Sequence, residues 1–179
     1  MITNKPSQLF LSVATVLLSS LIFLDTNVIA QTERIGKNTV YAEGASKGAT
    51  YSLNYERVFS YGDKFAKSYR VGLCFLNDVL AVPIGIQFIS GKGVHHAEYS
   101  FTAVPYIEHY NKLFSGNSLA DKKIFLMPGA GYRYQKPGNG FFGKVVVGPI
   151  IYLDPASDNF WRMDPKLYAG ITVAAGFAF

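Results

Sequence analysis

The last stretch of the sequence reads Leu167-Tyr-Ala-Gly-Ile-Thr-Val-Ala-Ala-Gly-Phe-Ala-Phe179, and its pattern decides the fold. Apolar residues alternate with small or polar ones, and side chains two positions apart lie on the same face of an extended strand. One face therefore carries Leu167, Ala169, Ile171, Val173, Ala175, Phe177 and Phe179. The opposite face carries Tyr168, Gly170, Thr172, Ala174, Gly176 and Ala178. This alternation predicts a β-strand with one apolar face.

The same alternation recurs along the chain between turn residues rich in Gly, Asn and Asp. It predicts further strands over residues 39–44, 50–56, 68–75, 80–89, 95–107, 123–134 and 141–152. About 150 residues follow residue 30, a length that eight strands of about ten residues and their turns would fill. We therefore predict an all-β fold, with one eight-stranded antiparallel up-and-down barrel over residues 31–179.

The composition of the two strand faces predicts which of them points outward. The polar face carries Gly, Ser, Thr, Asn and isolated charges, whereas a soluble barrel would cover its outside with Lys and Glu. The apolar face is dense in Tyr and Phe, as the aromatic girdles of membrane barrels are. These faces predict a transmembrane barrel with a polar lumen. A soluble ligand-binding barrel with the faces reversed is the alternative.

The start of the chain has the features of a secretory signal peptide. Lys5 precedes an apolar run from Leu9 to Leu24, and small residues near Ala30 provide a cleavage site. We expect residues 1–30 to be removed, with an uncleaved membrane anchor as the alternative. Gln31 stands where a lipoprotein would have Cys, and Cys74 is the only cysteine. Neither a lipid anchor nor an internal disulfide is expected.

A set of charged residues falls on the inward face of the predicted strands. Three acids can neutralise three bases there, and the six residues are Glu43, Glu56, Arg70, Glu98, Arg133 and Lys144. Buried charges are tolerable only when they are paired and hydrogen-bonded. We interpret this lumen charge network as a structural plug, with a gated or proton-sensitive pore as the alternative. Eight strands leave little more than room for side chains, which excludes a general diffusion porin.

No residue pattern in the sequence predicts a catalytic, cofactor or metal site. His96 and Glu98 share a strand face, but two candidate ligands do not make a metal site. Adding Ser100 does not make a hydrolase triad, because neighbours on one strand rarely reach the required geometry. The net charge of +5 is spread along the chain, so no nucleic-acid partner is expected.

Prolines interrupt four of the predicted strands. Proline removes a donor from the hydrogen-bonded ladder, so it belongs at strand ends, edges or bulges. We expect bulges or strand ends near the rim at Pro83, Pro105, Pro128 and Pro149. A weakened seam that admits a lipid chain sideways is the alternative.

Several segments resemble small predicted outer-membrane β-barrels of Gram-negative bacteria with an OmpX-like or OmpA-like architecture. The segments are Asn38-Thr-Val-Tyr-Ala-Glu-Gly44, Tyr51-Ser-Leu-Asn-Tyr-Glu-Arg57, Gly131-Tyr-Arg-Tyr134, Gly140-Phe-Phe142 and the final strand. The resemblance implies a monomer in the cell outer membrane, surrounded by outer-membrane lipid. It also implies insertion by the barrel assembly machinery, which would recognise a C-terminal signal containing Leu167, Ile171, Val173, Phe177 and Phe179.

Three functions are compatible with these features. We favour a non-enzymatic envelope protein with a plugged polar lumen and a structural or surface-interaction role. The first alternative is a lipid-modifying barrel enzyme, an acyltransferase or deacylase with lateral lipid access. The second is a narrow conduit for small solutes or ions.

Overall fold

The computed structural model describes residues 34–76, 78–91, 93–110, 121–154 and 165–179. They form nine antiparallel strands: β1 (Asn38–Ala45), β2 (Tyr51–Tyr61), β3 (Ala66–Leu76), β4 (Val79–Ala81), β5 (Ile84–Ser90), β6 (His95–Glu108), β7 (Asp121–Gln135), β8 (Gly140–Leu153) and β9 (Lys166–Ala178). The predicted signal peptide lies outside the described residues. Among the described residues, no helix has the length and apolarity needed to cross a membrane.

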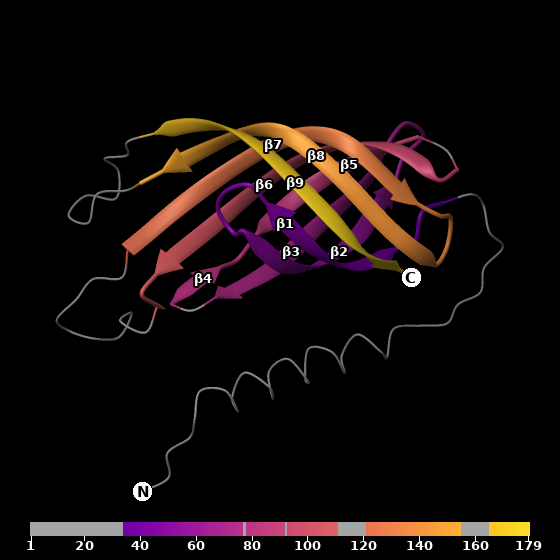
Figure 1. Cartoon of the computed structure of the whole chain (residues 1–179). Coiled ribbons are helices and arrows are strands. Elements are labelled where there is room, and N and C mark those ends of the chain that lie inside the picture. Colours follow the sequence, from indigo (N-terminus) through magenta and orange to yellow (C-terminus); the bar gives the residue numbers. More distant parts are fainter. Residues whose placement is uncertain (1–33, 77, 92, 111–120, 155–164) are drawn as a thin grey trace, which may run out of the picture. The chain divides into compact units, whose positions relative to one another are not determined.

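The strands close into a barrel, because β1 pairs with β2 on one side and with β9 on the other. The remaining pairs run in sequence order from β9 through β8, β7 and β6, and then by β4 and β5 to β3 and β2. Asn38 N and Phe179 N each donate to the carbonyl of the other residue at 2.8 Å, which fastens the closing pair. Figure 1 shows the strands crossing the barrel wall obliquely. The predicted all-β antiparallel barrel is confirmed.

β4 and β5 together occupy the position of one barrel strand, since both lie between β3 and β6. The prediction of one continuous strand over residues 80–89 is therefore wrong. Val82 and Pro83 separate the two pieces, because proline has no N–H to give to the ladder. Backbone hydrogen bonds still cross the break, from Gly72 N to Pro83 O at 2.7 Å and from Val82 N to Pro105 O at 3.0 Å. The count of barrel strands is eight in both the prediction and the structure.

The four strand prolines lie at two interruptions of the sheet. Pro105 faces the break between β4 and β5, although its pairing with Ile124 of β7 is intact. Pro128 and Pro149 lie opposite each other where the β7–β8 ladder has no pairs between Leu126 and Ala130. We call this gap in the ladder the proline seam. The prediction of strand ends or bulges is wrong for Pro128 and Pro149, which lie inside long strands.

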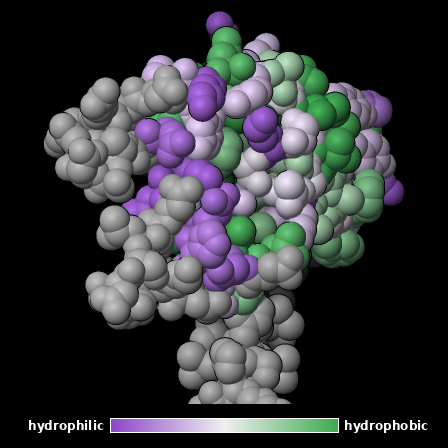
Figure 2. All heavy atoms as spheres, turned by 60° about the vertical axis from the view of Figure 1, so that its left-hand side comes forward, coloured by the Kyte–Doolittle hydropathy of each residue, from purple (hydrophilic) through white to green (hydrophobic). Residues whose placement is uncertain are grey.

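Exposure alternates along the strands and places polar side chains inside. In β9 the exposed residues include Leu167, Ile171, Val173 and Phe177, with exposed fractions of 46 to 71%. Figure 2 shows hydrophobic residues over the wall of the barrel and hydrophilic residues gathered toward one end. That end carries the turn at residues 46–50, the ends of β6 and β8 and the starts of β7 and β9, and we call it the loop end. The opposite end, with Asn38 and Phe179, is the terminal end.

Apolar clusters fill the interior near both ends. Near the loop end, Phe125, Val104 and Ile150 pack with Ala49, Cys74 and Ala81. Near the terminal end, Ile35, Val58 and Ile89 pack together. The buried charged residues lie between these clusters.

Candidate functional site

Six strands bring the predicted lumen charges together. Each residue lies at an inward position of its strand, with at most 5% of its surface exposed: Glu43 on β1, Glu56 on β2, Arg70 on β3, Glu98 on β6, Arg133 on β7 and Lys144 on β8. The inward position of Lys144 also fixes the register of β8, whose nearly continuous apolar sequence left that register ambiguous. The six formal charges sum to zero.

Arg133 is the centre of this network. One guanidinium nitrogen, Nη1, donates to Glu56 Oε1 at 2.7 Å and to Glu98 Oε2 at 3.0 Å. Nε donates to Gln135 Oε1 at 2.7 Å. The guanidinium carbon lies 4.5 Å from the centre of the Phe142 ring, so the cation also has an aromatic contact. Arg133 is fully buried and joins β2, β6 and β7 through charge-assisted bonds.

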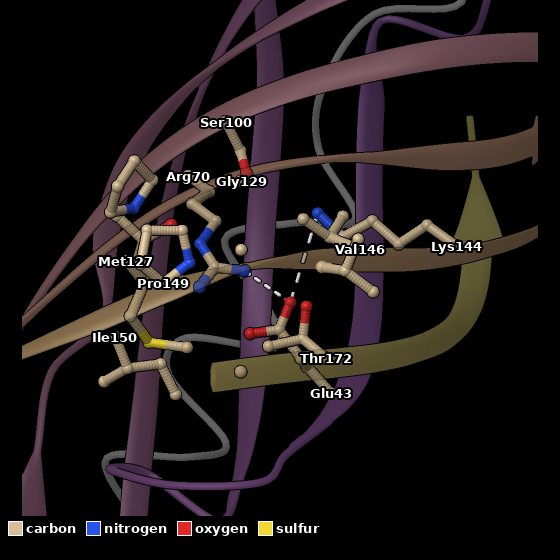
Figure 3. Close-up of a pocket in the computed structure, with 15 residues that line it drawn as sticks. Glu43, Arg70, Ser100, Met127, Gly129, Lys144, Val146, Pro149, Ile150 and Thr172 are labelled. Carbon is tan, nitrogen blue, oxygen red and sulfur yellow. Dashed lines mark hydrogen bonds and ion pairs between the residues drawn. The ribbon is translucent and has the colours of Figure 1, made fainter. Parts of the chain in front are cut away.

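Lys144 extends the network toward the loop end. Its Nζ donates to Glu98 Oε1 at 2.8 Å and lies 4.0 Å from Glu43 Oε2. Arg70 Nη1 forms an ion pair with the same Glu43 oxygen, so two cations converge on one carboxylate (Figure 3). The result is an unbroken chain of ion pairs from Arg70 to Glu56.

Neutral groups surround the charged chain. The Ser68 hydroxyl donates to Glu56 Oε1 at 2.9 Å, and the Tyr41 hydroxyl accepts from Arg70 Nη1 at 3.4 Å. Tyr41 also packs against Phe142, with ring centres 5.0 Å apart. The sequence analysis missed Tyr41 and Phe142, because it treated aromatic residues as belonging to the outer face. It missed Gln135 because the predicted strand ended at residue 134. Their signal was position, since Tyr41 and Gln135 stand two residues from Glu43 and Arg133, and Phe142 two from Lys144.

A small cavity lies between the charged chain and the proline seam. Its volume is about 20 Å³, room for about one water molecule. Glu43, Arg70 and Lys144 line it together with residues of β7 and β8 around Pro128 and Pro149. Figure 3 shows Pro149 and Met127 on the side of this cavity where Arg70 lies. The seam is not an open slot, because a Cβ on Gly148 would lie 2.1 Å from Pro128 O.

The other residues considered in the sequence do not form a site in the structure. His96 is buried, and its Nε2 lies 3.2 Å from the Gln135 carbonyl oxygen. Glu98, two residues further along β6, is bonded to Lys144 and Arg133 instead. Within the described ranges, no three His, Cys, Asp or Glu side chains gather as metal ligands would.

The residues of the predicted C-terminal assembly signal lie on the last strand and at its end. Leu167, Ile171, Val173 and Phe177 point outward from β9, and the Phe179 backbone pairs with Asn38. Recognition of this strand by the assembly machinery stays a prediction.

Comparisons with known proteins found a similar fold in one of the solved structures. Neither the family models nor the curated proteins provide a match to this chain. Among solved structures, the N-terminal β-barrel domain of Pseudomonas aeruginosa OprF is similar to it. The two share 15% sequence identity with a TM-score of 0.46, over 80% of this chain and 99% of that one.

Proposed function

We propose that this chain is a non-enzymatic outer-membrane β-barrel with a plugged lumen, and that its role in the cell envelope is structural or in surface interaction. The observation that carries the proposal is the distribution of polarity in the barrel. Twenty large hydrophobic side chains are exposed on the described surface, while six charged network residues are buried. Exposing so many apolar side chains to water is unfavourable, whereas the hydrocarbon core of a lipid bilayer is a favourable environment for them.

The interior supports a plug rather than a channel. The ion pairs from Arg70 to Glu56 cross the lumen, and apolar clusters lie toward both ends. The cavity beside Arg70 has a volume of about 20 Å³, which suits one water molecule but not a hydrated solute. A cavity of that size also cannot hold an acyl chain, so the proline seam does not favour a lipid-modifying enzyme.

Membrane residence is tested by extraction and gel mobility. The full chain is expressed in a Gram-negative host, and its membranes are washed with sodium carbonate and then dissolved in detergent. We expect the protein to stay with the outer membrane, and to migrate faster on a gel before boiling than after it. A chain that is soluble without detergent and has the same mobility in both samples would refute the membrane assignment.

Conduction is tested in planar bilayers with the purified protein. We expect no steady single-channel current from the original chain. If current is recorded, and if Arg70→Gln or Arg133→Gln changes it, the lumen is a conduit and the plug is wrong. Unchanged lipid A and phospholipid profiles after overexpression are expected as well, since the proposal includes no lipid chemistry.

A further inference from the structure

The outer wall of the barrel carries a basic patch at the terminal end. Arg57 on β2 and Lys67 on β3 point outward, and Lys64 lies in the exposed turn between these two strands. We call these three residues the basic rim. No other strand has an outward lysine or arginine among its described residues at this end. The positive charge on the wall is therefore confined to one sector of the barrel.

The basic rim carries more positive than negative charge. Its three cations form no ion pair with an acid of the described residues, unlike the cations of the lumen. Residues 51–76, which run through β2, the turn and β3, are all described and contain two acids. Glu56 is buried in the lumen, so Asp63 in the turn is the only one that shares this surface. Three cations therefore face one acid.

Aromatic rings surround the basic rim. Phe59 stands at a β-bulge of β2, is 59% exposed, and stacks on Tyr69 with ring centres 6.4 Å apart. The Phe65 ring packs edge-on against Phe88 and Tyr99, with ring centres 6.5 and 6.2 Å away. Aromatic side chains of membrane proteins gather at the level of the lipid headgroups. The rings therefore indicate the level at which the basic rim would meet lipid.

The register of β2 and β3 allows Arg57 and Lys67 to share one phosphate group. Arg57 lies opposite Tyr69, and Lys67 stands two residues from Tyr69 on the same face of β3. Long side chains in such diagonal positions are within reach of each other. Both residue types lay their alkyl chains along apolar surface and keep the charge at the level of water. A phosphodiester at that level can accept charge-assisted hydrogen bonds from both side chains.

The same sector of the wall offers an apolar surface to acyl chains. Further toward the loop end, Leu53 of β2, Val71 and Leu73 of β3 and Ile86 of β5 are 38 to 67% exposed. A lipid whose phosphate lay on the basic rim would have its acyl chains along these residues. Contact with both parts of one molecule distinguishes a lipid from a small soluble anion.

The turns indicate which leaflet supplies this lipid. Those at the terminal end, residues 62–65, 91–94 and 136–139, have four residues each. Short turns face the periplasm in outer-membrane barrels. We propose that the basic rim binds an anionic phospholipid of the periplasmic leaflet, with its phosphate on Arg57 and Lys67. This inference rests on the proposed outer-membrane location, but it does not require the lumen to be plugged.

Lipid preference is tested by native mass spectrometry of the full chain, purified in a neutral detergent. Phosphatidylglycerol, which is anionic, and phosphatidylethanolamine, which has no net charge, are added together at equal concentration and with identical acyl chains. We expect phosphatidylglycerol to bind more tightly, by about fivefold for each cation that meets its headgroup. Equal binding of the two lipids would overturn the proposal.

Substitutions locate the site. Arg57→Gln and Lys67→Gln should each weaken phosphatidylglycerol binding about fivefold, whereas Lys67→Arg keeps the charge and should bind like the original chain. Lys136→Gln is the matched control, because it removes an exposed cation at the same end, from the β7–β8 turn on the opposite side of the ring of strands. An equal loss in Lys136→Gln would mean that net charge alone attracts the lipid. That result would refute the site, as would unchanged binding in Arg57→Gln and Lys67→Gln. Gel mobility before boiling verifies that each variant is folded.

A soluble phosphate separates a lipid site from a site for small anions. Glycerol 3-phosphate has the phosphate but no acyl chains, so an excess of it should not displace phosphatidylglycerol. Displacement would overturn the assignment of the ligand as a lipid.

Extraction with sodium carbonate tests the membrane location separately. A barrel that stays in the membrane but binds both phospholipids equally would refute the basic rim alone. A chain that carbonate releases in soluble form would refute the membrane location and this inference with it.

Discussion

Replacing Arg133 by Met is expected to destabilise the barrel strongly, because no other cation of the described residues pairs with Glu56. Met fills part of the same space but carries no charge. Glu98 would keep its 2.8 Å bond to Lys144, whereas Glu56 would keep only the Ser68 hydroxyl. The six-residue network would change from neutral to a net charge of −1.

The expected magnitude follows from the burial of the pair. Arg133 and Glu56 are 0% and 1% exposed, and their closest atoms are 2.7 Å apart. Removing one partner of such a pair costs about 3 to 5 kcal/mol, because the other charge is left in a poorly polarisable interior. For a chain of this size, that loss corresponds to a fall in melting temperature of roughly 6 to 20 °C.

The assay follows the fast-migrating folded band on gels as the sample temperature is raised in detergent. Arg57→Met is the matched control, because it makes the same chemical change on β2 at a position that faces outward. Its effect should stay within about 0.5 kcal/mol. Equal melting temperatures for Arg133→Met and Arg57→Met would refute the reasoning.

A second substitution separates charge from packing. Glu56→Gln in the Arg133→Met background returns the network to neutrality, with two acids and two bases. The double variant should be more stable than the sum of the single effects predicts, by about 0.5 to 3 kcal/mol. Simple additivity would mean that lost packing, not the unpaired carboxylate, destabilises Arg133→Met.

Two further outcomes are expected. Gly176→Ala should lower the melting temperature, because its Cβ would lie 2.1 Å from the Val40 carbonyl oxygen in the closing pair of strands. Gly44→Ala is the control and should melt like the original chain, because a Cβ on Gly44 would have its nearest contact at 3.8 Å. Cys74 is 2% exposed, so a maleimide reagent should label it only after heating; fast labelling of the unheated, fast-migrating form would contradict its burial.

The period-two pattern predicted most of the strands and most of their faces. It worked because a barrel wall separates two different environments, so the alternation of polar and apolar residues in each strand indicates which of its faces points outward. The interruption at Pro83 was not predicted, since Val82 and Ile84 continue the alternation on either side of it. The proline seam was not predicted either, because it depends on Pro128 of β7 meeting Pro149 of β8. Which residues lie opposite each other depends on the register between the two strands, and the alternation within one strand does not give it.

The ion pairs within the charge network could not be predicted from the sequence for a similar reason. The pattern placed Glu56 and Arg133 inside, but it did not show which acid meets which base. Strand tilt and stagger bring together residues that are 77 positions apart. The inward position of Phe125 was also missed, because the aromatic residues were assigned to the outer girdles.

The closing contact between Asn38 and Phe179 has a consequence for assembly. Its partners come from opposite ends of the described chain, so the β1–β9 ladder is the pairing of longest sequence separation in the sheet. Until it forms, the sheet has two free edges with rows of unpaired N–H and C=O groups, which readily accept strands of other molecules. A single ladder removes both edges at once. Protection from aggregation is therefore acquired only when the barrel closes, and an incomplete barrel must be prevented from pairing with other copies until then.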